Sequence, residues 1–223
     1  MIVPRMTIPE MVTEARKDYR ALWNKVDSIL PKMRRMHLRD RAHEQYHMEA
    51  WRSPRKNNWL LHFGIRKAGL NMHPLVWTYD TKGRIIALIV TQSGRTTYLD
   101  NHMIQRYGER FDPTSNPLER LQSFFYENNY HAVETLHERS PGVWEVRVGM
   151  NHGLGLGEWD QHTDIMHIRT FVSYDLLFPN QLDLMERLDA QRAWDALTIG
   201  QQTEALNRAK RLEAQQEQRD KAA

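Results

Sequence analysis

The period of the apolar residues changes along this chain, and that change limits the folds that it can adopt. From about Pro9 to Trp51, apolar residues recur every three to four positions, as they do on one face of a helix. After a break at residues 53–58, short runs of alternating apolar and polar residues follow, which is the period of strands. Helical runs and strand runs that occupy separate stretches are typical of the α+β class. We therefore predict an α+β fold.

The first half of the chain is predicted to hold two helices and an antiparallel meander. Pro31 interrupts the helical stretch, so we expect one helix before it and one after it. Turn residues at 80–83 and 93–94 separate the later strands of the meander. The predicted strands are residues 59–65, 75–79, 84–92 and 96–99.

The second half is predicted to contain a helix pair, three antiparallel strands and a long C-terminal helix. Asp100 or Asn101 caps a helix that runs to Phe111, and a second helix follows at 117–128. The predicted strands are 131–137, 143–150 and 165–172, and the glycine-rich segment 151–163 is predicted to be a mobile loop over the sheet. The terminal helix starts near residue 180. We divide the chain into an N-terminal basic helical region (1–56), an α+β core (57–200) and a charged tail, helical or disordered (201–223).

Composition excludes several classes of site and of location. The chain has no cysteine, so disulfides, iron–sulfur clusters and thiol nucleophiles are excluded, and a metal would need His and carboxylate ligands. The longest apolar run is Ile85 to Val90, which is far too short to span a bilayer. We expect a cytoplasmic protein with no membrane partner.

Positive charge is unevenly distributed, although the chain as a whole carries a formal net charge of only +3. The most basic stretch has two alternative explanations, a solvated helix face or a surface that binds along a phosphate backbone. Its cationic residues are Arg34, Arg35, Arg39, Arg41, Arg52, Arg55 and Lys56.

The segment YLDNHMIQRYGERF carries the first candidate catalytic group. On the predicted helix, His102 and Arg106 lie one turn apart, with Glu109 and Arg110 one further turn along. A neutral imidazole at a helix start suits a general base, and the two guanidinium groups suit a phosphate. The alternative is that Arg106 and Glu109 form an ordinary surface ion pair.

Two later strands add basic residues on one side of the sheet. In 143–150, alternation assigns Trp144, Val146, Val148 and Met150 to the core and turns Arg147 the other way. In the last strand Met166, Ile168 and Val172 are predicted to face the core, and His167 and Arg169 to face away. If the strands pair, Arg147, His167 and Arg169 share one sheet face. That face is either an anion site or an ordinary solvated surface.

Residues 96–197 resemble the RelE, barnase and ribonuclease-colicin grouping of small metal-independent ribonucleases. The resemblance rests on the order of elements, on the motif H-x-x-x-R-x-x-E-R at residues 102–110 and on the IRTF of residues 168–171. It covers under half of the chain, and its motif is similar to one in uncharacterised phage- and toxin-associated branches.

The resemblance implies a RelE-like sheet and an endoribonuclease that cleaves RNA by transesterification without a cofactor. In that chemistry a base removes the ribose 2′-hydroxyl proton and arginine stabilises the pentacoordinate phosphate. His102 would then be the base or acid, with Arg106 and Arg110 on phosphate. Family members that lose catalysis bind RNA or another nucleic acid.

A competing motif is HEQYH, which matches H-E-x-x-H on a predicted helix. There His43 and His47 would bind zinc and Glu44 would activate its water, which makes a zinc metallohydrolase the alternative function. No third ligand follows at the usual spacing, because Ala50 and Ser53 stand at those positions.

A third hypothesis is a non-catalytic, phage-type structural or assembly protein. In it the basic helix makes assembly contacts, and the C-terminal helix makes contacts that form a homo-oligomer. Three tryptophans are also candidates for stacking on nucleic-acid bases, namely Trp51, Trp59 and Trp159.

Overall fold

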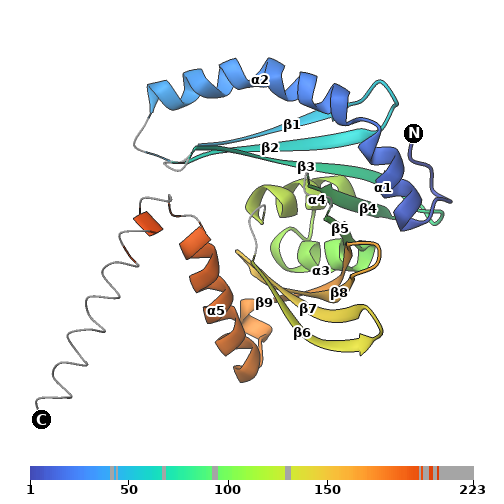
Figure 1. The fold of residues 1–223 in the computed structure, drawn as a ribbon, viewed down its shortest axis with the longest axis vertical. Helices are drawn as coiled ribbons and strands as arrows, with labels where there is room; N and C mark the ends of the chain where they lie inside the picture. Colours follow the sequence, from blue (N-terminus) through green and yellow to red (C-terminus); the bar gives the residue numbers. More distant parts are fainter. Residues whose placement is uncertain are drawn as a thin grey trace, which may run out of the picture.

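The protein folds around one nine-stranded sheet with helices on both faces (Figure 1). This computed structural model describes residues 1–40, 43, 45–66, 69–91, 95–128, 132–195, 197, 201, 202 and 205. The predicted α+β class is confirmed. Most of the predicted tail, 201–223, lies outside the described residues.

The elements follow one another as two helices, five strands, two helices, four strands and a terminal helix. In chain order they are α1 (Ile8–Arg16), α2 (Tyr19–Arg39), β1 (Gln45–Arg52), β2 (Asn58–Arg66), β3 (Gly69–Tyr79), β4 (Ile85–Val90), β5 (Thr96–Leu99), α3 (Asn101–Phe111), α4 (Pro117–Glu127), β6 (Ala132–Ser140), β7 (Val143–Met150), β8 (Gly153–Asp160), β9 (Ile165–Ser173), a single 3₁₀ turn at Tyr174–Leu176, and α5 (Pro179–Asp195).

Two antiparallel meanders join to form the sheet. The strand order is β1-β2-β3-β4-β5-β9-β8-β7-β6, and β5 pairs with β9 in parallel while the other neighbours are antiparallel. The sheet curls around α3 and α4, with β1–β3 on one side of these helices and β6–β8 on the other (Figure 1). Because β5 and β9 are central neighbours, the residues at their ends come together.

Each face of the sheet is covered by a different set of helices. α1 and α2 pack on one face, where Leu22 and Met33 meet Trp59 and Phe63. α3 and α4 pack on the other, against alternate residues of β4, β7 and β9. α5 returns to the first face and covers Leu154 through Leu184 and Leu188. Between α1 and α5, the remaining outward side chains of β7, β8 and β9 form what we call the open face, which includes Glu145, Arg147, Glu158, His167 and Arg169.

The helical start of the chain differs from the prediction in where it breaks. α2 continues through Pro31, and the break lies at Lys17 and Asp18, before α2 begins. A proline inside a helix removes one hydrogen bond to the carbonyl four residues earlier. Both Pro31 and Asp27 are exposed, so water can solvate that carbonyl and the helix tolerates the interruption.

The predicted helix through HEQYH is wrong, because Gln45 to Arg52 form the edge strand β1. The register with β2 is unbroken, and His47 stacks on Phe63 with ring centroids 6.3 Å apart. Alternate residues of this segment therefore face α2. Because the segment follows α2 closely in the sequence, its alternating pattern resembles a continuation of that helix.

The glycine-rich segment is also not a loop, since its residues form β8 between β7 and β9. A side chain at Gly157 would meet the His167 carbonyl oxygen, which lies 2.1 Å from the ideal Cβ position. Glycine is therefore needed for close approach of β9 at a point where the β8–β9 register shifts. The same shift at Arg169 brings Phe171 rather than Val172 into the core.

The predicted helices after β5 are confirmed. The Asp100 side chain caps α3 by accepting from the His102 N–H, and Asn116 with Glu119 forms a capping box at α4. No helix in the described part of the chain is both long enough and apolar enough to cross a membrane.

Candidate functional site

A dense group of charged side chains occupies the open face of β7, β8 and β9. Glu145, Glu158 and His167 are direct cross-strand neighbours on β7, β8 and β9. Their Cβ atoms are therefore about 5 Å apart along one row. Tyr98 on β5 continues this row, because it pairs with His167.

Two guanidinium groups converge on the carboxylate of Glu158. Arg139 Nη1 donates to Oε1 at 3.1 Å, and Arg169 Nη2 donates to Oε2 at 2.6 Å. The arginines come from β6 and β9, on either side of β8, and about half of each side chain is exposed. This arrangement holds two charge-assisted donors side by side in a geometry that suits a phosphate.

Glu145 is the buried anchor of the same network, with 6% of its side chain exposed. Its direct neighbour is another carboxylate, Glu158, and like charges at directly opposite positions repel. Arg139 removes this repulsion by donating to both carboxylates. Arg147 and His137 also contact Glu145, so the buried charge is compensated.

Acid is expected to weaken the fold through this anchor. The Arg139 guanidinium holds the pKa of Glu145 below its usual value. Such a carboxyl stabilises the folded state above its unfolded pKa of about 4.3, and the contribution is lost as the pH falls. We expect the melting temperature to drop as the pH falls below about 5, and Glu145→Gln to flatten that dependence. Circular dichroism measures both, with the exposed Glu186→Gln as the control. An unchanged slope in Glu145→Gln would contradict this account.

His167 is held by the carboxylate of Asp100, at the end of β5. Their Nε2 and Oδ2 atoms are 3.3 Å apart, while the other Asp100 oxygen accepts the His102 N–H that begins α3. The hydrogen bond from His167 keeps the pKa of Asp100 below its usual value. An ionised Asp100 favours a proton on Nε2, which leaves Nδ1 able to accept one.

Tyr98 packs edge-on against the His167 ring, with centroids 4.8 Å apart. Burial raises the pKa of Tyr98 to about 12, so this phenol stays protonated. Tyr98 therefore holds the ring in place and is not a base at neutral pH.

A cavity of about 290 Å³ adjoins His167 and Glu158. Ile8 and Pro9 at the start of α1 form an apolar wall, and Asp160 and Thr163 lie at another side. The Asp160 carboxylate already accepts hydrogen bonds from the Thr163 hydroxyl and from backbone N–H groups. The cavity thus combines an oriented imidazole and an apolar wall with the Glu158 carboxylate to which Arg139 and Arg169 donate.

The structure brings together only half of the residues predicted from sequence. Arg147, His167 and Arg169 lie on the open face, as alternation predicts. α3 packs on the opposite face of the sheet, so His102 and Arg106 do not join them. Arg106 forms the surface ion pair with Glu109, and Arg110 donates to Ser173.

The HEQYH residues do not adopt the helical spacing that a zinc site of that type requires. His43 precedes β1 and lies 3.0 Å from Asp40, whereas His47 is within the strand, 3.3 Å from Lys32. Glu44 lies outside the described residues. Among the residues that the structure describes, no three His, Asp or Glu side chains are grouped to hold a metal ion.

Asp100, Arg139 and Glu158 are the site residues that sequence reasoning missed. Asp100 was visible only as a helix cap, and Glu158 lay within the segment interpreted as a loop. Alternation of leucine and glycine in GLGLGEWD was the available signal for a strand, and it would have turned Glu158 outward with Leu154 and Leu156. Searches of this chain against protein families, curated proteins and solved structures give no match.

Proposed function

We propose that this protein cleaves single-stranded RNA without a metal ion, using the open face of β7–β9. One observation carries the proposal: Arg139 and Arg169 converge on Glu158 beside an imidazole that a carboxylate orients. General acid–base catalysis needs a base held in one tautomer, and phosphoryl chemistry needs fixed donors where negative charge develops.

In this proposal His167 is the general base. Its Nδ1 accepts the ribose 2′-hydroxyl proton, the 2′-oxygen forms a bond to phosphorus, and the bond to the 5′-oxygen breaks. The leaving oxygen takes a proton from solvent. Arg139 and Arg169 bind the phosphate, which replaces the Glu158 carboxylate as their hydrogen-bond acceptor. Both guanidinium groups then stabilise the negative charge that develops on the phosphate.

The test is cleavage of a labelled single-stranded RNA in the presence of EDTA, with a 2′,3′-cyclic phosphate as the expected product end. We expect Arg169→Ala to lower kcat by about 100-fold, because it removes a donor to the developing charge. Lys82→Ala is the control, since Lys82 is exposed in the β3–β4 turn.

Two results would contradict the proposal. The first is an RNA that remains intact with the wild-type protein. The second is full activity in Arg169→Ala together with loss in Arg106→Ala, which would move the site to α3. Thermal unfolding of each variant separates loss of chemistry from loss of fold.

A further inference from the structure

The surface of α2 carries more net positive charge than the whole chain. The helix contains six Lys or Arg residues and a single acidic residue, Asp27. The chain as a whole has 31 basic and 28 acidic residues, so the remainder is slightly acidic. Such a concentration of charge on one helix is the electrostatic feature expected of a surface that meets a polyanion.

The arginines of α2 also differ from the others in their partners. Arg20, Arg34, Arg35 and Arg39 form no ion pair with any described residue. Between residues 84 and 192, every arginine except Arg120 lies within 4.0 Å of a carboxylate. Across residues 84–192 the fold therefore pairs nearly all of its arginines, whereas α2 leaves four unpaired; outside α2, Arg5 and Arg52 also form no ion pair with a described residue.

The ordinary explanations account for little of this pattern. The partial negative charge at the end of a helix favours cations only in the last turn, which explains Arg39 but not Arg20 or Arg34. Lys32, Arg35 and Arg39 follow one another at one-turn spacing, where like charges destabilise a helix. A membrane surface is disfavoured because the apolar stripe of α2, which includes Leu22 and Met33, is buried against the sheet.

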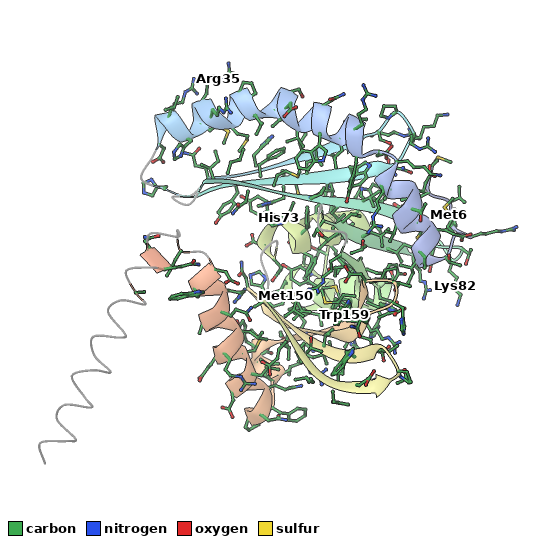
Figure 2. All side chains as sticks on the ribbon, viewed as in Figure 1. Met6, Arg35, His73, Lys82, Met150 and Trp159 are labelled. Carbon is green, nitrogen blue, oxygen red and sulfur yellow. The ribbon has the colours of Figure 1, made fainter. Side chains whose placement is uncertain are left out.

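We propose that α2 binds the sugar–phosphate backbone of the single-stranded RNA whose scissile phosphate lies on the open face, an inference that rests on the proposed function. α2 and the open face belong to the same face of the curled sheet, α2 over β2 and the open face at β7–β9, with α1 between them. Arg35 projects from α2 away from the sheet (Figure 2). The contacts are to phosphates, so they position the strand without reading its sequence.

The test measures binding of a fluorescein-labelled single-stranded RNA by anisotropy, in the His167→Ala background so that the probe stays intact. We expect Arg35→Gln with Arg39→Gln to weaken binding about tenfold and to reduce the salt dependence of log Kd by about 1.4, since each phosphate contact contributes about 0.7. The matched control, Lys82→Gln with Arg187→Gln, removes the same charge from the β3–β4 turn, where Figure 2 labels Lys82, and from α5.

The outcomes separate this inference from the proposed cleavage. Weaker RNA binding in the α2 variant, with unchanged binding in the control variant, supports the role of α2. If the wild-type protein leaves RNA intact, that result overturns the proposed cleavage but not RNA binding by α2. Equal loss in the control variant overturns the role of α2, because charge alone would then govern binding. Unchanged RNA binding in the α2 variant, or binding to phosphatidylserine vesicles in place of RNA, also overturns it.

Discussion

Replacing His167 by alanine is expected to lower kcat for RNA cleavage by about 100- to 10,000-fold, the range typical of a lost general base. The imidazole is oriented by Asp100 and lines the cavity beside Glu158. Alanine removes the proton acceptor but leaves the arginines that bind phosphate, so KM is expected to change little. Gel analysis of RNA cleavage under single-turnover conditions measures the chemical step directly.

Asp100 offers a sharper version of the same experiment. In Asp100→Asn the side-chain oxygen can still cap α3, because asparagine is as good a cap as aspartate. Its amide group would donate to His167 Nε2 and favour the tautomer that carries the proton on Nδ1. We expect kcat to fall while the melting temperature stays near that of the wild type. Full activity in both His167→Ala and Asp100→Asn would contradict the assignment of the base.

Replacing Trp59 by alanine is expected to reduce the free energy of unfolding by about 3 to 5 kcal/mol. The indole is 1% exposed in the core beneath α1 and α2, and its Nε1 donates to the buried carboxylate of Asp18 at 2.9 Å. Alanine leaves a cavity and also removes one of the donors to that carboxylate. Urea denaturation followed by circular dichroism measures the loss.

A conservative substitution separates the two contributions. Trp59→Phe keeps most of the apolar volume and removes the N–H, so we expect a smaller loss of about 1 to 3 kcal/mol. Asn57 Nδ2 still donates to Asp18 in that variant. A loss below about 1 kcal/mol in Trp59→Ala would contradict the buried position of the indole. The same burial excludes the predicted role of Trp59 in stacking on a base.

Segments with strong local signals were predicted well. Asp100 marks the start of α3, the span of α4 is predicted to within one residue, and the alternation in β7 correctly divides Val146 and Val148 from Arg147. The errors fall where two signals compete. Gln45 to Arg52 follow a helix and contain residues that suit either state, and the glycines of β8 resemble a loop although they allow close packing of β9.

The candidate site could be predicted only in part for a related reason. His167 and Arg169 are neighbours along one strand, so alternation was enough to assign them to one face. Their partners Glu158 and Arg139 come from β8 and β6, and Asp100 comes from the end of β5. Nothing in the local pattern specifies that β5 pairs in parallel with β9 across more than sixty residues of chain.

The sequence by itself determined the α+β class, the cap of α3, the face of Arg147 and the concentration of arginines that begins at Arg34. These depend on interactions between residues a few positions apart, which local spacing encodes. Only the tertiary structure decided that Glu158 lies between Glu145 and His167, that Asp100 orients the imidazole and that α3 faces away from it. Such contacts depend on strand order and register, which the burial of both sheet faces selects for the chain as a whole.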